Sequence, residues 1–275
     1  MLEVGTRTGR VSMVAAETLR TLCEGTMLRG LLRIAILSTA WMTILALLSV
    51  VALRWVPPPT TSFMIAERIR APSQKIEYDW VPWSQISPQA ALAVVASEDQ
   101  RFPRHRGFEL GATRRALAHW WHGEKTRGAS TITQQVAKNL FLWPGRSAVR
   151  KVLEGALTVV IETLWSKQRI LEIYLNVAQL GPGTFGVEAA SRRYFRKDAS
   201  KLTASEAALL AVVLPNPERL RVDRPSPYVL RRRAWVLKQM NRLGGTAYLR
   251  ELDGVERSRQ APRAKRAAER GASGS

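Results

Sequence analysis

Residues 148–165 read AVRKVLEGALTVVIETLW, and this stretch decides the fold class. Its apolar side chains recur at spacings of three and four residues, which predicts one long amphipathic helix. The apolar positions are Val152, Leu153, Ala156, Leu157, Val160, Ile161 and Leu164. No stretch of the chain alternates well enough to predict a strand. The sequence therefore predicts a mainly α-helical protein.

Helix-start signals on both sides of this stretch support the same fold class. Ser87 followed by Pro88 predicts the cap and first residue of a helix over QAALAVVASED. Ser130 is predicted to cap a second helix, TITQQVAKNL. The remaining start and stop signals are a Thr203–Glu206 capping box, Pro215, Ser226-Pro227 and Gly244-Gly245.

An uncharged apolar segment near the N-terminus predicts a membrane anchor. Residues 34–53 read IAILSTAWMTILALLSVVAL, and as a helix this run spans about 30 Å, the thickness of a bilayer core. A buried core helix rarely needs so long an uncharged run, and the long segment before it argues against a cleaved signal peptide. We expect an uncleaved anchor. Basic residues on both sides leave its orientation open.

The rest of the chain divides by composition. The prolines at 57–59 predict the end of the anchor and the start of an extended linker. Residues 251–275 combine charges with Ala, Gly and Ser and contain no aromatic residue, which predicts disorder. The expected divisions are an N-terminal segment at 1–33, the anchor at 34–56, a linker at 57–77, a compact domain at 78–245 and a disordered tail at 246–275.

Overall composition limits the classes of function. The chain has 42 basic and 22 acidic residues, a formal net charge of +20, which implies a polyanionic partner such as nucleic acid, anionic lipid or a phosphate-bearing substrate. Cys23 is the single cysteine, so no internal disulfide can form. The chain has three histidines, which excludes a histidine-rich metal cage. His119 and His122 are interpreted as surface residues, because no third ligand type accompanies them.

Glu98 is the first candidate catalytic residue. Together with Asp99 it closes an apolar helix, where the negative end of the helix dipole disfavours a charged carboxylate. An apolar neighbourhood would raise the pKa of Glu98 further, which suits a general base. On the residues alone, two solvated acids at a helix end are the alternative interpretation.

The stretch GASTITQQ at 128–135 is a candidate anion site. It joins a flexible turn to a helix start, where free backbone N–H groups and two hydroxyls face the same way. Gln134 and Lys138 are four residues apart and share a helix face, so the lysine can meet the same anion. A plain helix cap at Ser130 is the alternative.

A second cationic group lies on the long helix. Arg150 and Lys151 are four and three residues before Glu154, so one face carries two cations and a carboxylate. An ordinary surface salt bridge is the alternative interpretation.

Five stretches, in this order, resemble the motifs of the peptidoglycan glycosyltransferases, glycosyltransferase family 51. They are EDQRFPRHRG at 98–107, GASTITQQVAKN at 128–139, RKVLE at 150–154, KQRILEIYLN at 167–176 and GVEAASRRYF at 186–195. The resemblance covers roughly residues 60–245. Only about thirty residues follow Gly245, so the chain is similar to the monofunctional members, which lack a transpeptidase domain. Gln179 departs from the pattern, because many relatives carry an acid there.

The resemblance implies a fold, a reaction and a location. The fold would be a lysozyme-like helical domain with a membrane-associated lobe, on the periplasmic side of the cytoplasmic (inner) membrane, with residues 1–33 inside. The reaction would polymerise lipid II into β-1,4-linked glycan by inverting transfer, releasing undecaprenyl diphosphate. Glu98 would be the base, and Glu154 the second family carboxylate. The residues implied to bind substrate are Ser130, Thr131, Gln134, Gln135, Lys138, Arg146, Arg150 and Lys151.

The expected partners follow from the same resemblance. They are lipid II, the growing lipid-linked strand and the membrane, with no nucleic acid and with a cell-wall synthesis complex as a further expectation. No metal ligand set is visible, and a divalent cation, Mg or Mn, is left open as a companion of the diphosphate.

Three other functions compete with this interpretation. A lytic glycosidase of similar fold would cleave the same glycan, but a neutral glycan does not require cationic second and third motifs. A membrane-tethered nucleic-acid binder would need a contiguous basic patch with interleaved aromatics, whereas the basic residues are dispersed. A scaffold derived from an inactive enzyme is disfavoured by the intact first three motifs.

Overall fold

The computed structural model describes residues 32–109, 111, 130–145 and 147–252. Helices dominate these residues, which confirms the mainly α fold class. The chain divides into two compact units, Met1–Ala52 and Leu53–Ser275, and each is described by itself. The predictions for Cys23, His119 and His122 lie outside the described residues.

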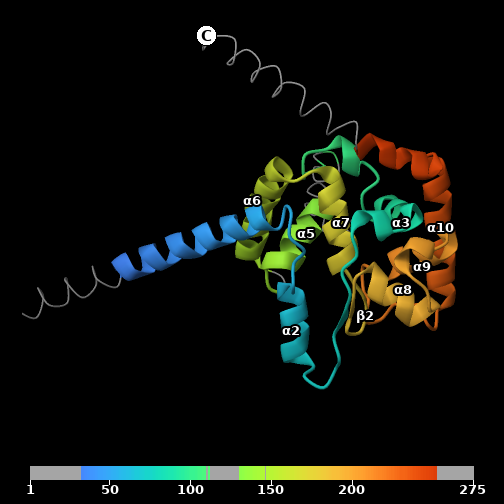
Figure 1. The fold of residues 1–275 in the computed structure, drawn as a ribbon, viewed down its shortest axis with the longest axis horizontal. Helices are drawn as coiled ribbons and strands as arrows, with labels where there is room; N and C mark the ends of the chain where they lie inside the picture. The colour runs from blue at the N-terminus through green and yellow to red at the C-terminus, as the bar shows by residue number, and fades with distance from the viewer. Residues whose placement is uncertain (1–31, 110, 112–129, 146, 253–275) are drawn as a thin grey trace, which may run out of the picture. The chain divides into compact units, whose positions relative to one another are not determined.

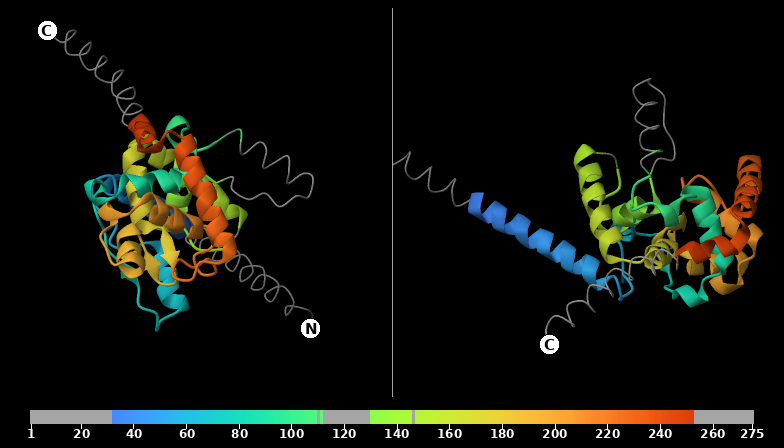
Figure 2. Two further views of the ribbon diagram at one scale, coloured as in Figure 1. Left: turned by 90° about the vertical axis from the view of Figure 1, so that its right-hand side faces the viewer. Right: turned by 90° about the horizontal axis from the view of Figure 1, so that it is seen from above.

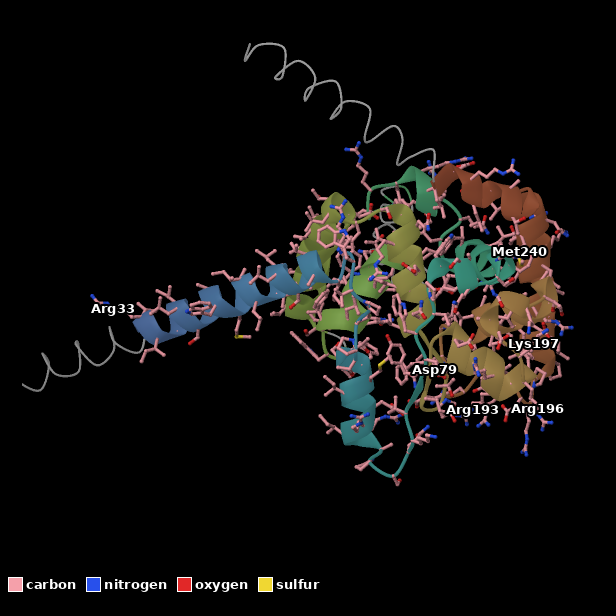
Figure 3. The ribbon with its side chains drawn as sticks, in the orientation of Figure 1. Arg33, Asp79, Arg193, Arg196, Lys197 and Met240 are labelled. Carbon is pink, nitrogen blue, oxygen red and sulfur yellow. The ribbon has the colours of Figure 1, made fainter. Side chains whose placement is uncertain are left out.

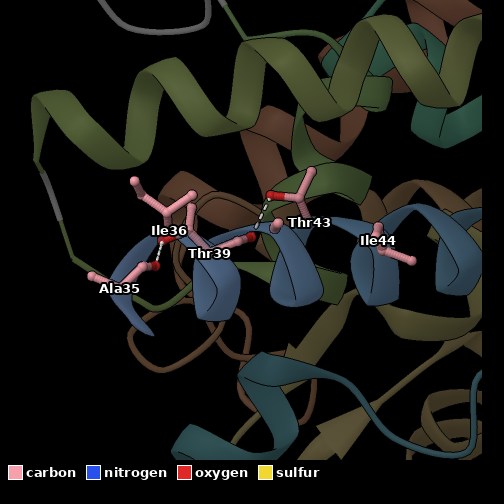
Figure 4. A pocket seen from close by; sticks show the side chains of 6 residues that line it. Ala35, Ile36, Thr39, Thr43 and Ile44 are labelled. Carbon is pink, nitrogen blue, oxygen red and sulfur yellow. Dashed lines mark hydrogen bonds between the residues drawn. The ribbon is translucent and has the colours of Figure 1, made fainter. Parts of the chain in front are cut away.

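In its described residues the first unit consists of the helix Leu32–Ala52, of 21 residues. It is long and apolar enough to cross a membrane, and its apolar side chains are almost all exposed, unlike those of a core helix. Thr39 and Thr43 donate their hydroxyls to the carbonyls four residues earlier, beside a shallow apolar groove (Figure 4). No hydroxyl of these two threonines is therefore left without a partner in a lipid environment.

The apolar core of the second unit lies where three helices meet. They are α3 (Pro88–Glu98), α9 (Ala204–Val213) and α10 (Pro227–Arg242), and each packs on the other two (Figure 1). Residues 90–96 of α3 are all buried, because this helix has no polar face. The predicted caps of all three are confirmed: Ser87, the Thr203–Glu206 capping box and Ser226.

A second helix group consists of α5 (Ile132–Phe141), α6 (Ala148–Leu164) and α7 (Lys167–Val177), with α5 packed on both others. The long helix predicted at 148–165 is confirmed as α6, and Ile161 of its apolar stripe is buried, but other apolar positions of the stripe face solvent. Val152 is 72% exposed and Leu153 is 42% exposed, whereas Arg150 and Glu154 on the opposite face are buried. Its apolar face is thus left for something other than the core.

A further helix, α2 (Ser62–Arg70), lies where the sequence predicts an extended linker, so that prediction is wrong. Thr61 caps α2 by accepting a hydrogen bond from the Met64 N–H. The Ser62 hydroxyl donates to the Leu142 carbonyl at 2.6 Å, which ties α2 to the end of α5. The segment is therefore part of the second unit.

A small sheet overturns the prediction that the chain has no strands. Its strands are β1 (Glu77–Tyr78), β2 (Gln179–Gly181) and β3 (Thr184–Phe185), in the order β1-β3-β2. β3 pairs parallel with β1 and antiparallel with β2. Strands of two or three residues are too short to show alternation, which is why the pattern missed them.

The chain after β3 forms α8 (Val187–Phe195) and η3 (Ala199–Lys201). After α10 it forms a further 3-10 helix, η4 (Gly245–Leu249). Arg193, Arg196 and Lys197 gather at the end of α8 (Figure 3). The Tyr248 hydroxyl donates to the Gln100 carbonyl at 2.6 Å, and Leu252 is buried. The packed unit thus continues to residue 252, beyond the predicted boundary at 245, and residues 253–275 lie outside the described part.

Among the described residues of the second unit there are two further 3-10 helices, η1 (Trp83–Gln85) and η2 (Phe102–Arg104). The turned views of Figure 2 show α10 (orange to red) as a long helix of this unit. η2 follows directly on the end of α3 and leads the chain toward the start of α5. Side chains at the end of α3 accept hydrogen bonds from α5, so the segments that carry the first two motifs meet where α3 ends and α5 begins.

Candidate active site

Glu98 is the last residue of α3 and is half-buried. Its Oε2 accepts a hydrogen bond from the Gln135 side-chain amide at 2.9 Å, and its Oε1 accepts one from the Ser97 hydroxyl at 3.3 Å. The carboxylate is thus held by two neutral donors, and no cation of the described residues forms an ion pair with it. It remains able to accept a proton.

Tyr174 on α7 fixes the orientation of Gln135. Its hydroxyl donates to the Gln135 Oε1 at 2.9 Å, so the amide nitrogen of Gln135 faces Glu98. Burial, together with the negative charges of Glu98 and Asp99, raises the pKa of Tyr174 well above its usual value. Tyr174 therefore stays protonated as a donor, a role that the sequence did not reveal.

Burial raises the pKa of Glu98, as the sequence predicted. The hydrogen bonds from Gln135 and Ser97 and the positive charge of Arg232 oppose this rise, while the charge of Asp99 adds to it. The dominant cause is loss of water around the carboxylate, which disfavours its charged form. A carboxylate in this condition is a stronger base than one in water.

Asp99, the neighbour of Glu98, has a structural role. His105 Nε2 lies 2.9 Å from both carboxylate oxygens, and the Ile132 N–H donates to one of them at 3.1 Å. The Gly107 N–H donates to His105 Nδ1, which leaves the ring proton on Nε2 facing Asp99. Asp99 therefore joins the end of α3 to the start of α5.

Thr131, and not Ser130, caps α5, so the predicted cap was one residue too early. Thr131 and Gln134 form a capping box, with the Thr131 N–H donating to the Gln134 side chain at 2.9 Å. The Thr131 hydroxyl also donates to the Gly107 carbonyl at 2.6 Å. Both side chains are buried, whereas Ser130 is exposed. Thr131 and Gln134 are occupied in building the helix start, and Ser130 is open to a ligand.

The predicted cationic group does come together around Glu154. The Arg150 Nη1 lies 2.9 Å from one carboxylate oxygen, and the Lys151 Nζ contacts the other. Burial lowers the pKa of Lys138 on α5; the charge of Glu154 opposes this, and the charges of Arg150 and Lys151 add to it. Two cations thus contact one carboxylate and Lys138 adds a third positive charge from α5, which leaves an excess of positive charge.

Two features mark this cluster as a site for an anion. Arg150 is 9% exposed, and its Nε is buried with no hydrogen-bond partner among the described residues. A buried N–H without a partner is costly unless a ligand fills the place. Gln135, which donates to Glu98, lies three residues before Lys138 on α5, so base and cluster border one site. Arg146, the other predicted member, lies outside the described residues.

A buried ion pair lies beneath this site and was not predicted. The Lys167 Nζ on α7 lies 2.7 Å from the Glu162 Oε1 on α6, which also accepts from the Thr133 hydroxyl at 2.6 Å. The Lys167 ammonium lies 4.5 Å from the centre of the Phe102 ring in η2. Four chain segments thus meet at one buried charge pair.

The cluster around Glu154 does not fit a metal ion. Each oxygen of its carboxylate contacts a cation, and the neighbouring groups are themselves cationic. Across the parts of the chain that the structure describes, no group of three or more His, Cys, Asp or Glu side chains comes together. The arrangement suits an anionic oxygen ligand beside a general base.

Comparisons with known proteins agree with this chemistry. The profile of the transglycosylase family matches residues 65–241. A biosynthetic peptidoglycan transglycosylase of Klebsiella oxytoca is 54% identical over 230 residues, which cover 82% of this chain and 92% of the relative. One of Pseudomonas entomophila is 48% identical over 231 residues, which cover 82% of this chain and 98% of the relative.

Proposed function

The chain belongs to the transglycosylase family and is a peptidoglycan glycosyltransferase of cell-wall synthesis, and from this premise we propose that it polymerises lipid II by an inverting transfer. The observation that carries the proposal is a half-buried glutamate beside a cluster of three cations, one with a buried N–H left open. Lipid II and the growing lipid-linked strand are the substrates.

The proposed reaction uses Glu98 as its base. The Glu98 carboxylate removes the proton from the 4-hydroxyl of the acceptor GlcNAc, and that oxygen attacks C1 of the donor MurNAc. The bond from C1 to the diphosphate breaks, and undecaprenyl diphosphate leaves with the electron pair. The α-linked donor gives a β-1,4 product, so the transfer is a single inverting displacement.

The cationic cluster supports the leaving group in this proposal. A glycosidase must protonate a poor alkoxide leaving group, whereas a diphosphate is already a stable anion. Preorganised positive charge from Lys138, Arg150 and Lys151 stabilises the negative charge that develops on it. A lytic enzyme acting on neutral glycan has no use for such a cluster, and nothing in the site favours that alternative.

The direct test is incubation of the purified full-length protein with labelled lipid II, followed by separation by size. The proposal expects polymer and released undecaprenyl diphosphate. If folded protein makes no polymer but releases fragments from preformed glycan, the lytic alternative replaces the proposal.

We expect Glu154→Gln to weaken substrate binding without removing the base. Glu154 holds Arg150 and Lys151 in place through its two oxygens, so its loss lets the cations spread. The KM for lipid II should rise about ten-fold, equivalent to ~1.4 kcal/mol of lost positioning. The pH at which activity falls on the acid side should not move. Loss of turnover with unchanged binding and fold would instead give Glu154 a direct catalytic role.

We further propose that this is a single-pass protein of the cytoplasmic (inner) membrane, with its catalytic unit on the periplasmic side. The helix Leu32–Ala52 supports an anchor by its length and composition. The exposed apolar face of α6 and the exposed Ile65 and Ile69 of α2 support contact of this lobe with lipid. Both substrates carry lipid chains, so their diphosphates lie at the membrane surface.

Removal of residues 1–52 should impair the enzyme more on bilayer substrate than on detergent-solubilised substrate. The cut spares Leu53 and Val56, whose carbonyls accept hydrogen bonds from Arg169, so the second unit keeps these contacts. We expect the rate on vesicles to fall about ten-fold or more, because anchoring raises the local concentration of lipid-bound substrate. An equal loss of rate in both assays would contradict this role for the anchor.

Two further partners belong to the proposal. We place any divalent cation, Mg or Mn, on oxygens of the substrate diphosphate and not on the protein. The strand that the proposed reaction makes is a component of the cell wall, and on that ground we propose contact with a cell-wall synthesis complex.

A further inference from the structure

One face of α10 carries a row of exposed side chains in which aromatic residues and cations are interleaved. The row consists of Tyr228, Arg231, Trp235, Lys238 and Arg242, and we call it the α10 row. Successive members are three or four residues apart, so they share one helix face, and at about 1.5 Å per residue the row is about 21 Å long. Tyr228 is 54% exposed and Trp235 is 37% exposed. The row is therefore a continuous surface, although the basic residues look dispersed in the linear sequence.

The cations of the α10 row keep their positive charge. No carboxylate among the described residues forms an ion pair with Arg231, Lys238 or Arg242. Arg232 flanks the row and stacks on Trp235, with its Cζ 3.7 Å from the ring centre, instead of pairing with an acid. Other exposed cations of the same unit do pair with carboxylates, namely Arg192, Arg193, Lys197 and Lys201. The row is thus a local excess of positive charge.

The rest of the chain does not balance this charge. Residues 253–275 contain six basic and three acidic residues, and residues 112–129 contain four basic and one acidic residue. Residues 1–31 contain four basic and three acidic residues. A second copy of a chain with a net charge of +20 would be repelled. By charge complementarity, the row suits a separate and negatively charged partner.

The α10 row lies away from the surface that we assign to lipid. α10 packs on α3 and α9, whereas α6, with its exposed apolar face, packs on α5. Figures 1 and 2 show α6 and α10 on opposite sides of the second unit. A membrane in contact with α6 does not face the α10 row. The partner therefore reaches the row from the aqueous side.

The α10 row passes close to the end of α3, where the base lies. Gln239 comes four residues after Trp235, and its side chain accepts a hydrogen bond from the Gln100 amide at 3.5 Å. Gln100 is two residues after Glu98. A polymer that grows at Glu98 therefore finds the row on a neighbouring surface of the same unit.

We propose, on the basis of the function proposed above, that the α10 row binds the glycan strand that the enzyme makes. Each repeat of a peptidoglycan strand carries a peptide, and a peptide attached through its amino end has a free carboxylate at its other end. The guanidinium and ammonium groups of the row pair with these carboxylates. The rings of Tyr228 and Trp235 offer flat apolar surfaces to the sugars.

The contacts of the α10 row act together. Each exposed ion pair contributes little by itself, but several contacts to one polymer raise its effective concentration at the surface. A strand held on the row stays beside Glu98 after each transfer and remains available for the next one. The row thus favours longer products without taking part in the chemical step.

The test measures binding without turnover. Full-length protein in detergent is titrated into fluorescently labelled, preformed strands that carry peptides but no lipid, so the cationic cluster has no diphosphate to bind. For the triple variant Arg231→Gln, Lys238→Gln, Arg242→Gln we expect a Kd about ten-fold higher than that of the wild type. All three side chains are exposed, so the buried face of α10 is unchanged.

The matched control removes three exposed cations from other elements of the same unit. It is the triple variant Lys75→Gln, Arg196→Gln, Lys201→Gln. Its Kd should stay within about two-fold of the wild type, because the total charge changes equally but the row is intact. Equal affinities of the wild type and the α10 variant, or an equal loss in the control, would overturn the proposal.

An arm on the wild type needs no substitution at all. Strands whose peptide carboxylates have been amidated should bind the wild type about as weakly as untreated strands bind the α10 variant. Undiminished binding of amidated strands would overturn the proposal. Vesicles of phosphatidylglycerol, poly-L-glutamate and single-stranded DNA are the comparison ligands. If the α10 substitutions weaken binding of one of these and leave strand binding unchanged, the row serves lipid, an acidic protein or nucleic acid, and the proposal is wrong.

Preformed strands also separate this inference from the proposed function. If strands bind through the row but lipid II is not polymerised, the proposed function fails and the binding surface stands. If polymer forms but the α10 variant binds strands as well as the wild type does, the inference alone fails. From labelled lipid II the α10 variant should make strands at least about two-fold shorter than those of the control variant. Strands of equal length would contradict retention of the product on the row.

Discussion

We expect Glu98→Gln to lose polymerisation, with kcat falling about 10²–10⁴-fold, the usual contribution of a general base. The amide oxygen of a glutamine can still accept the hydrogen bond that Gln135 donates at 2.9 Å, so the local structure has no reason to change. The cationic cluster is untouched, and the KM for lipid II should stay close to that of the wild type. Continuous measurement of polymer formation with labelled lipid II checks both values.

Stability provides a second readout for the same variant. Because burial raises the pKa of Glu98 above its unfolded value, its ionisation opposes folding, and this cost grows as pH rises through the folded pKa. Glu98→Gln should therefore unfold at the same temperature as the wild type or a higher one at neutral pH, and the difference should shrink toward acid pH.

The matched control is Glu251→Gln, a change in an exposed ion pair with Arg104 that should leave both activity and stability nearly unchanged. Activity of Glu98→Gln within about ten-fold of the wild type would remove Glu98 from the role of base.

Helix starts in this chain were predictable where a local rule fixes them. Ser87, Thr203 and Ser226 cap helices as predicted, because a hydroxyl followed by proline or by a glutamate three residues on satisfies free N–H groups locally. The cap of α5 was misplaced by one residue between two adjacent hydroxyls. Thr131 has a glutamine three residues later, and that capping-box signal was present in the sequence.

The parts of the site that the sequence missed depend on contacts between distant segments. Tyr174 reaches Gln135 from α7, and the Ile132 N–H at the start of α5 donates to Asp99 at the end of α3. No local spacing encodes such pairs, because only the packing of the helices brings them together. Arg150 and Glu154 were predicted as a pair because they lie one helical turn apart.

We expect Lys167→Met to cause the largest loss of stability among the changes considered. The change removes the cation that Lys167 brings to the buried Glu162 carboxylate, and Lys167 itself is 1% exposed. Breaking such a pair costs about 3–5 kcal/mol, which lowers the unfolding temperature of a unit of this size by about 6–20 °C. Thermal and denaturant unfolding of the full-length protein measure the loss.

Two comparison variants tell a buried charge from a lost contact. Lys201→Met breaks an exposed pair with Asp198 and should cost at most about 1 kcal/mol. Adding Glu162→Gln to Lys167→Met removes the buried negative charge that Lys167 balanced, and the amide oxygen can still accept from Thr133, so much of the stability should return. If Lys167→Met lowers the free energy of unfolding by no more than Lys201→Met does, the Lys167–Glu162 pair does not hold these segments together. A large loss of stability that Glu162→Gln reverses shows that the Lys167–Glu162 pair fixes how η2, α5, α6 and α7 meet. Because α3 leads into η2, and α5 and α6 carry the cations, the pair then also fixes the positions of the base and the cations in the site.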